Sequence, residues 1–391
     1  MTASKGVLLA ALVATLVTAC SGPILANPTV PAIPPPTGSP APSTAPDPQP
    51  ITFPPDDAAH HRLTEWWYYT GHLVDTDGHH WGFEFVVFRA ERGGFPVTWA
   101  SHLALTDESA GTFSYAQRAE IGPQVDQSPP GGAAFAFEIR GALSAGAGAA
   151  APAPTPWTMS NAVGPDRLQG ALDDGTTLDL SLVSTKPPAL HGDNGWIDFG
   201  PAGGSYYCSR TRLDASGSLN VGGRRLAVTG EAWFDHQWGD FISVGGGGWD
   251  WFAINLDGGT DLTLSLVRAA DGSFPLVYGT LVGGDGSVRH LAADDFTVTS
   301  TGTWTSPHTG AKYPAGWQIT VHRQSLICDL TMDLTPTVAD QELDTRASTG
   351  VVYWEGSQRV AVTPCGEGDQ LGGQLGGEAY VELTGYGSAK P

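Results

Sequence analysis

Two aromatic segments of this sequence repeat one another. Residues 65–89 read EWWYYTGHLVDTDGHHWGFEFVVFR, and residues 249–268 read WDWFAINLDGGTDLTLSLVR. When Trp66 is aligned with Trp249, the aromatic and apolar positions stay in register through both segments, provided that the turn in the second segment is four residues shorter. The chain therefore carries one hairpin-like pattern twice, and any fold for it has to accommodate this duplication.

A second pair of segments repeats in the same order along the chain. Residues 230–235 read GEAWFD, and residues 377–382 read GEAYVE. Each copy thus opens on an aromatic hairpin and closes on a strand-like segment that ends with an acidic residue. Because self-similarity over such a distance is typical of a duplicated structural unit, we expect two homologous domains.

Turn signals indicate that both domains consist of β-strands. Asp- and Gly-rich turns interrupt alternating apolar segments at short intervals, and no helical period of any length is present. We therefore expect an all-β fold of two tandem antiparallel β-barrel domains, residues 56–244 and 245–386, because closure into barrels removes exposed strand edges. Further strands are expected at residues 98–105, 134–139, 176–183 and 205–213, with a long surface loop at residues 141–156.

The charge balance narrows the range of partners. The chain has 19 Lys and Arg residues against 40 Asp and Glu residues, which gives a net charge of −21. Such a surface repels a polyanion, so we expect no nucleic-acid partner. The hydrophobic content of 41% is sufficient for packed cores in a chain of 391 residues.

The N-terminus has the features of an export signal. Lys5 precedes an apolar run at residues 6–17, and the VTAC motif at residues 17–20 has the form of a bacterial lipobox. This predicts a signal peptide at residues 1–20, lipidation of Cys20 and a cell-envelope lipoprotein held at the membrane. Ordinary secretion and an uncleaved anchor are the alternatives, although the run is short for a bilayer span. If the lipid anchor exists, a Cys20→Ala variant loses its membrane association on fractionation, and unchanged retention contradicts the anchor.

Residues 21–55 are rich in Pro, Ala, Ser and Thr and almost uncharged, a composition that buries too little apolar surface to fold. We expect a disordered spacer there. Lipidation of Cys20 leaves Cys208, Cys328 and Cys365, one pair of which an exported protein can bridge, although the sequence does not say which. Neither a C-x-x-C nor an H-E-x-x-H motif occurs, so we expect no metal and no cofactor.

Six separated motifs resemble those of one known family. They are EWWYYTGHL at residues 65–73, GEAWFDHQWG at 230–239, W-x-S-P with Y-P-x-x-W at 304–317, DQEL at 340–343, YWEG at 353–356 and Y-x-E-L-T-G-Y at 380–386. In this order they resemble the lipocalin-like family of carotenoid 1,2-hydratase and AttH-type proteins, many bacterial members of which are labelled secreted hydrolases. The resemblance covers almost the whole chain after the spacer and implies two tandem lipocalin-like β-barrels.

The same resemblance implies a site for an apolar ligand in or between the barrels. Relatives handle isoprenoid or polyketide molecules, and the hydratases are thought to protonate an alkene with an acidic side chain. The position that matches the acid-bearing motif here is Asp235, followed by His236. The preceding Trp233 and Phe234 depart from the tyrosine-and-histidine neighbourhood of the hydratases. Because the acid-bearing motif is matched at Asp235, the resemblance implies hydration, isomerisation or cyclisation by acid catalysis.

Asp235 and His236 are the candidate catalytic residues. On a strand, neighbouring side chains face opposite sides, so only one of the two can face a given cavity unless a bulge intervenes. An aspartate that faces an aromatic interior has a raised pKa and can donate a proton near neutral pH. The structural alternative is an aspartate that accepts backbone N–H groups beside a histidine whose hydrogen bonds are satisfied.

The candidate ligand-binding residues lie in or near the same motifs. They are Glu65, Trp66, Trp67, Tyr69, Trp238, Trp249, Trp251 and Arg210. Alternation places Trp66 and Trp67 on opposite faces, so one packs the barrel and the other packs the domain interface or lines a pocket. We expect Glu65 and Glu84 to be ion-paired with Arg89 or Arg210, because a buried unpaired carboxylate is costly.

Two classes of function fit these residues. One is an envelope enzyme that acts by acid catalysis on an unsaturated apolar small molecule, and the other is a non-catalytic carrier of a lipid or similar ligand. They differ in whether an ionisable group projects into the cavity. A secreted hydrolase is a further alternative, which the lack of a G-x-S-x-G motif weakens.

Overall fold

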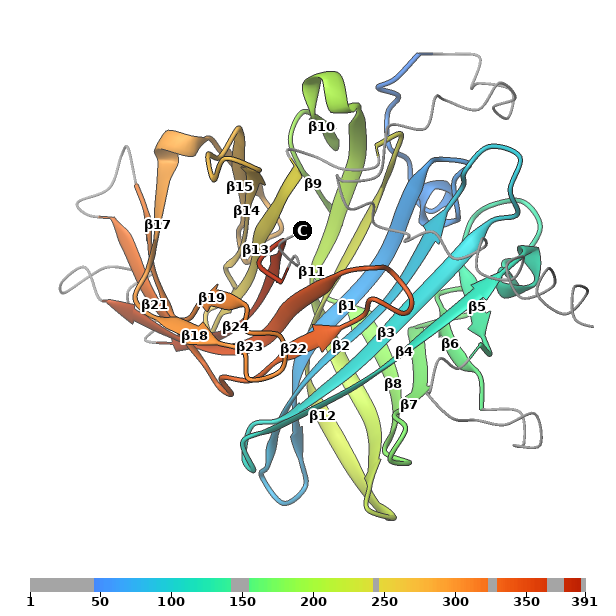
Figure 1. Ribbon diagram of the computed structural model, residues 1–391, viewed down its shortest axis with the longest axis horizontal. Helices are drawn as coiled ribbons and strands as arrows, with labels where there is room; N and C mark the ends of the chain where they lie inside the picture. Colours follow the sequence, from blue (N-terminus) through green and yellow to red (C-terminus); the bar gives the residue numbers. More distant parts are fainter. Residues whose placement is uncertain (1–45, 142–154, 242–245, 323–328, 364–375, 388–391) are drawn as a thin grey trace, which may run out of the picture.

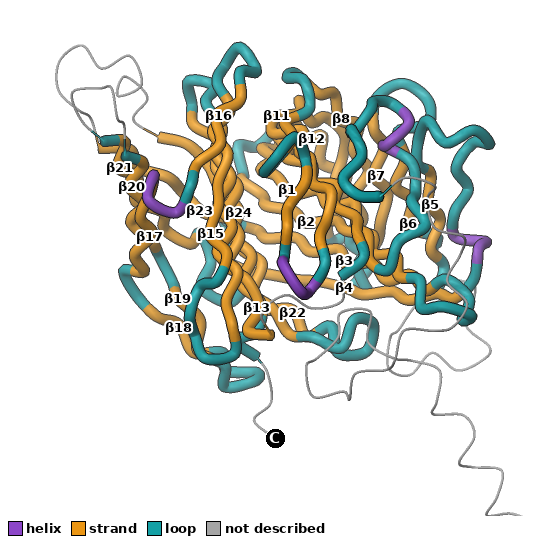
Figure 2. The backbone as a smooth tube through the Cα atoms, turned by 90° about the horizontal axis from the view of Figure 1, so that it is seen from above, coloured by secondary structure: helices purple, strands orange, loops and turns teal. Residues whose placement is uncertain are grey.

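The structure is a computed structural model that describes residues 46–141, 155–241, 246–322, 329–363 and 376–387. Strands dominate it (Figure 2), and the helical elements are the short 3₁₀ turns η1 (Pro55–Asp57), η2 (Pro123–Val125), η3 (Gly200–Ala202) and η4 (Ala293–Asp295). Among the described residues, no helix is long and apolar enough to cross a membrane. Two large antiparallel sheets lie side by side in Figure 1.

The first sheet forms the first barrel. Its strands are β1 (Thr64–Asp75), β2 (His80–Ala90), β3 (Thr98–Asp107), β4 (Thr112–Ile121), β5 (Ala136–Ile139), β6 (Trp157–Ser160), β7 (Asp166–Ala171), β8 (Thr177–Ser184), β9 (Ala189–Leu190), β10 (Trp196–Asp198), β11 (Gly204–Val221) and β12 (Arg224–Gly239). They run in the order β4-β3-β2-β1-β12-β11-β8-β7-β6-β5, with β9 and β10 paired to β11. The end strands approach one another, since the Ala119 N–H donates to the Gly141 carbonyl at 3.2 Å, so the barrel is nearly closed.

The second sheet forms the second barrel. Its strands are β13 (Gly246–Leu256), β14 (Asp261–Ala269), β15 (Leu276–Val282), β16 (Val288–Leu291), β17 (Phe296–Ser300), β20 (Trp317–Val321), β21 (Leu330–Pro336), β22 (Glu342–Asp344), β23 (Val352–Thr363) and β24 (Gly376–Thr384). They run in the order β16-β15-β14-β13-β24-β23-β21-β20-β17, with β22 paired to β23. Only η4 separates the end strands β16 and β17 in sequence, and a small hairpin of β18 (Thr303–Thr305) and β19 (Lys312–Pro314) lies between β17 and β20 in the chain. The all-β class and the two nearly closed antiparallel barrels are thus confirmed.

The repeated segments occupy equivalent places in the two barrels. In the first, β1 pairs with β2 on one side and β12 on the other; in the second, β13 lies in the same way between β14 and β24. Asp235 stands opposite Tyr68, and its counterpart Glu382 stands opposite Trp251. The change from one sheet to the other falls between the end of β12 and the start of β13.

The glycine that opens each repeated GEA segment is required by a close backbone approach. A Cβ atom at Gly230 would lie 1.9 Å from the carbonyl oxygen of His72, and one at Gly377 would lie 2.3 Å from the carbonyl oxygen of Asn255. Both distances are far below van der Waals contact, so any side chain there would push the central strands apart. The duplicated sequence thus preserves a duplicated contact.

Both faces of the central strands are buried, each in a different core. Trp67 and Tyr69 of β1 point into the core of the first barrel, as Phe252 of β13 does in the second. The alternate residues Tyr68 and Trp251 pack instead in a separate cluster between the barrels. The double burial explains why β1 is aromatic on both faces, whereas a strand with one solvated face would alternate.

The remaining predictions on chain organisation are met in part. The expected strands appear as β3, β5, β8 and β11, the last extending eight residues further than expected. Residues 46–55, which the sequence analysis assigns to the spacer, contact the first barrel, and Asp47 pairs with Arg62 at 2.6 Å. Cys208 is buried and free, whereas Cys20, Cys328, Cys365 and most of the expected loop at residues 141–156 lie outside the described residues.

Candidate active site between the two barrels

A cavity of about 90 Å³ lies where the outer faces of the two sheets meet. That volume holds several water molecules or part of a small organic ligand. Its lining comes from both barrels and is mostly aromatic. The lining residues are Trp66, Tyr68, Glu84, Val86, Phe88, Phe199, Tyr207, Asp235, Gln237, Phe241, Trp249, Trp251, Ser265, Val267, Tyr278 and Glu382.

Asp235 faces this cavity from β12, and its carboxylate is held by three donors. The Tyr207 hydroxyl donates to Oδ2 at 2.6 Å, the Trp233 indole N–H donates to Oδ1 at 2.6 Å, and the Ser209 hydroxyl also donates to Oδ1. The three bonds favour the charged form, but burial opposes it more strongly and raises the pKa of Asp235 to about 6. Asp235 is therefore an acid that is partly protonated near neutral pH.

Behind Asp235 lies a hydrogen-bonded chain that the sequence analysis missed. Ser209 Oγ lies 2.6 Å from His191 Nε2, and His191 Nδ1 lies 2.8 Å from Thr280 Oγ1 of the second barrel. All three side chains are fully buried, and burial lowers the pKa of His191 to about 3, which keeps the imidazole neutral. Ser209 lies in the strand expected at residues 205–213, but only the structure pairs that strand with β12, and no sequence motif marks His191.

This chain bears on the hydrolase alternative. In a Ser-His-Asp hydrolase the carboxylate orients the histidine and the serine hydroxyl faces the substrate. Here Asp235 bonds to Ser209 itself, and Ser209 is not among the cavity-lining residues. The geometry therefore fits a serine that positions the aspartate, and it does not fit a serine nucleophile.

Two further carboxyl groups reach the cavity. Glu382, the counterpart of Asp235 in the repeat, accepts the Trp249 indole N–H at 2.9 Å, and its pKa is raised to about 7 by burial and then by the charge of Asp235. Glu84 accepts the Tyr353 hydroxyl at 2.9 Å, and burial raises its pKa as well. The expected ion pair of Glu84 with an arginine is wrong, because the bond from Tyr353 takes its place.

The predicted site residues divide between this cavity and the interior of the first barrel. Asp235, Trp66, Trp249 and Trp251 line the cavity. The other predicted residues do not line it: His236, Glu65, Trp67, Tyr69, Trp238 and Arg210. Strand alternation accounts for the split, since no bulge separates Asp235 from His236 in the pairing of β12 with β1.

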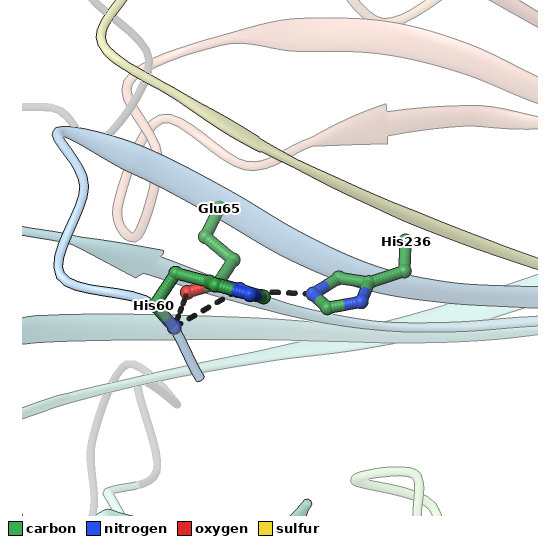
Figure 3. Close-up of side chains that lie close together, drawn as sticks. All are labelled: His60, Glu65 and His236. Atoms are coloured by element: carbon green, nitrogen blue, oxygen red, sulfur yellow. Dashed lines mark hydrogen bonds and ion pairs between the residues drawn. The ribbon is translucent and has the colours of Figure 1, made fainter. Parts of the chain in front are cut away.

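Within the second group, Glu65 is a buried carboxylate that lies between His236 and His60 (Figure 3). Glu65 Oε1 lies 2.7 Å from His60 Nδ1 and 2.9 Å from His236 Nε2, and Trp238 stacks on the His60 ring at a centroid distance of 4.1 Å. Arg89 is 3.9 Å from Glu65, so the expected arginine is present but the histidines make the hydrogen bonds. Burial raises the pKa of Glu65, but the positive charge of His60 is the largest of the effects that lower it, and together these effects hold the pKa at about 2.

Arg210 has a structural environment of its own. Its guanidinium pairs with Asp166 at 2.6 Å, donates to the Tyr69 hydroxyl at 3.0 Å and lies 4.2 Å from the centre of the Phe234 ring. These contacts lie in the first barrel, where the predicted ligand-binding role of Arg210 and Tyr69 is not supported by the cavity described above.

His60, Glu65 and His236 are also the one group among the described residues whose donor atoms could hold a metal ion, all within 4.8 Å of one another. No metal was expected from the sequence, because neither a C-x-x-C nor an H-E-x-x-H motif occurs. The close contacts of Glu65 with both imidazoles have the lengths of hydrogen bonds. The Nδ1 atom of His236 has no hydrogen-bond partner among the described residues, so the hydrogen bonds of the cluster satisfy Glu65 but not all of His236.

The fold and the site together define a class of protein. Two antiparallel barrels, built from one repeated hairpin and closing strand, enclose an aromatic cavity with buried acids, which is the architecture of tandem lipocalin-like proteins. Residues 44–386 match the AttH-like family, so the chain belongs to it. No curated protein matches the sequence.

Solved structures agree with this assignment. A putative AttH protein of Nitrosomonas europaea is 29% identical, with a TM-score of 0.70 over 86% of this chain and 97% of that one. Kievitone hydratase of Nectria haematococca is 16% identical, with a TM-score of 0.62 over 86% and 93% of the two chains. CghA, solved with Sch210972, is 14% identical, with a TM-score of 0.52 over 83% and 90%. The last two share the fold.

Proposed function

We propose that this protein binds an apolar, isoprenoid- or polyketide-like small molecule between its barrels and hydrates, isomerises or cyclises it by acid catalysis, with Asp235 as proton donor. The observation that carries the proposal is the position of Asp235, a buried carboxyl group with a raised pKa in the wall of an aromatic cavity. Two proteins of the same fold are compatible with it, one a kievitone hydratase and the other solved with Sch210972.

The residues supply each part of such a reaction. The protonated Asp235 gives its proton to one alkene carbon, and the other carbon becomes cationic. The faces of Trp66, Trp249 and Trp251 stabilise that cation. A water molecule then adds through its oxygen and returns a proton to the Asp235 carboxylate, which completes hydration. Loss of a proton from a neighbouring carbon instead gives isomerisation.

The bonds that hold Asp235 fit both halves of this cycle. Tyr207 carries a rotatable hydroxyl group, which donates to Oδ2 of the carboxylate and can turn to accept from the carboxylic acid, whereas Ser209 donates to Oδ1 in both states. The Trp233 indole can only donate, so it keeps Oδ1 an acceptor and leaves the exchanging proton to Oδ2. Oδ2 is thus the oxygen from which the proton leaves.

The proposal is tested by identifying the ligand and following oxygen. Mass spectrometry of small molecules that co-purify with the lipid-free protein names the chemical class, and incubation of the unsaturated members in ¹⁸O-labelled water tests hydration. We expect labelled alcohols. Apolar compounds that bind and remain unchanged indicate the non-catalytic carrier, and soluble sugars or peptides in the extract contradict both functions.

The location of the protein is a separate proposal that rests on the sequence. The lipobox at residues 17–20 favours an exported lipoprotein anchored through Cys20, with the globular part carried outside the cytoplasm. An apolar ligand is compatible with a protein held beside a membrane, since such ligands partition there. The fractionation of the Cys20→Ala variant described above is the test.

A further inference from the structure

The charged groups in the cavity wall all have one sign. Among the described lining residues there are three acids, Asp235, Glu84 and Glu382, and no lysine, arginine or histidine. The wall therefore carries zero or negative charge in every protonation state. A ligand with a carboxylate or phosphate would find no cation to neutralise it and would be repelled whenever one of the acids is ionised.

Glu84 has an oxygen without a partner. The side chain is 1% exposed, and while Oε1 accepts the Tyr353 hydroxyl, Oε2 has no hydrogen-bond partner among the described residues. Buried polar atoms in folded proteins are nearly always paired. Because Glu84 is also one of the cavity-lining residues, a group on the ligand is positioned to supply the missing hydrogen bond.

The aromatic part of the wall has the same electrostatic preference as the acids. Nine of the sixteen lining residues are aromatic, and Trp66, Trp249 and Trp251 are among them. The face of an aromatic ring carries partial negative charge and attracts a cation, most strongly for tryptophan. Aromatic faces together with carboxylates are the combination that holds organic ammonium groups, whereas neither attracts an anion.

We propose that the natural ligand is an apolar compound that carries a basic amine, and that the interdomain cavity binds its ammonium group against Glu84, Glu382 and the tryptophan faces. This inference deepens the proposed function, on whose cavity it rests, by naming the substrate class. The tryptophan faces and carboxyl groups that would stabilise a carbocation during the reaction are the same groups that bind the ammonium group of the ligand before the reaction begins.

The test is a binding series with one apolar ring and three head groups. The compounds are N,N-dimethylcyclohexylammonium, cyclohexyl methyl ketone and cyclohexanecarboxylate, titrated into the lipid-free protein at neutral pH by calorimetry. We expect the ammonium to bind most tightly and the carboxylate most weakly, with at least about a tenfold difference between them. A carboxylate that binds as tightly as the ammonium, or no saturable binding of the ammonium, overturns the proposal.

Variants assign the preference to the cavity. Glu84→Gln and Glu382→Gln should each reduce the advantage of the ammonium over the ketone several-fold, whereas Glu138→Gln, on β5 of the first barrel and outside the cavity, should leave it unchanged. An equal loss in all three variants contradicts the assignment. The binding series requires no turnover, so its outcome is independent of catalysis. If the protein prefers the ammonium but catalyses nothing, only the proposed function is refuted. If it catalyses hydration but prefers the carboxylate, only the proposed ligand class is refuted.

Discussion

Asp235→Asn is expected to lower the rate of the proposed alkene hydration by about 10²- to 10⁴-fold, the usual contribution of a general acid. Asparagine has nearly the shape of aspartate and keeps an oxygen that accepts the bonds from Trp233 and Ser209, but it has no proton of suitable acidity to give to a carbon atom. The measurement is single-turnover hydration of the alkene identified by co-purification. Asp214→Asn, an exposed position on β11, is the matched control and should retain full activity.

The pH dependence gives an independent readout of the same group. Catalysis needs the protonated acid, so the wild-type rate should fall as the pH rises through about 6, and the residual rate of the Asn variant should lack this inflection. The direction in which folding stability changes with pH is also fixed, because the folded-state pKa of Asp235 is raised above its ordinary value of 3.8. Below 3.8 the group is protonated in both states; between 3.8 and 6 the unfolded chain ionises first, and wild-type stability falls.

It follows that the melting temperature of Asp235→Asn should gain on that of the wild type as the pH rises from about 4 to about 6, since the variant has no buried acid to ionise. A fully active Asn variant ends the role of Asp235 as proton donor. A variant that is inactive because it is unfolded would be recognised by its melting curve, and Ser209→Ala then tests the same acid by shifting the inflection of the pH profile.

Asp261→Ala is expected to have the largest effect on stability. Asp261 of β14 is fully buried and accepts hydrogen bonds from Lys186 at 2.6 Å and from Arg212 at 2.8 Å, both of which belong to the first barrel. Removing the carboxylate leaves a buried ammonium group without its counter-ion, which costs about 3–5 kcal/mol. Urea unfolding followed by tryptophan fluorescence measures the loss.

Two further variants show whether that loss of stability comes from the unpaired buried charge. Asp214→Ala, an exposed aspartate of the first barrel, should change the free energy of unfolding by less than about 0.5 kcal/mol. Adding Lys186→Met to Asp261→Ala should recover part of the stability, because the unpaired charge is then gone. If the free energy of unfolding of Asp261→Ala lies within about 1 kcal/mol of the wild-type value, the ion pairs of Asp261 with Lys186 and Arg212 do not hold the barrels together.

How far the site was predictable is seen by comparing Asp235 with Glu84. Asp235 lies in a motif that resembles the acid-bearing motif of a family, and strand alternation separates it from His236, so its candidacy needed no coordinates. Glu84 lies in an equally apolar strand, but whether it is ion-paired or faces a cavity depends on what stands opposite. Tyr353, its partner, is 269 residues away, and no local pattern relates the two.

The candidate residues inside the first barrel also show that the sequence does not say which face of a strand lines the cavity. Trp66 and Trp67 are equally aromatic, and alternation states only that they face opposite ways. Trp66 lines the cavity because the outer face of its sheet meets the second barrel, and Trp67 belongs to the core of the first. His236 joined Glu65 and His60 for a similar reason, since the inward face of β12 meets a segment that precedes β1.

The sequence by itself determined the duplication and the all-β class, because these depend on periodicity, turns and repeats that can be read along the chain. The pairing of each aromatic hairpin with its GEA strand joins distant segments and came from the structure. Only the tertiary structure decided which faces of the two sheets pack together, and with that which acids became buried in a common cavity. The physical reason is that both faces of β1 and β13 are apolar enough to be buried, so hydrophobicity alone does not distinguish the barrel interior from the interface.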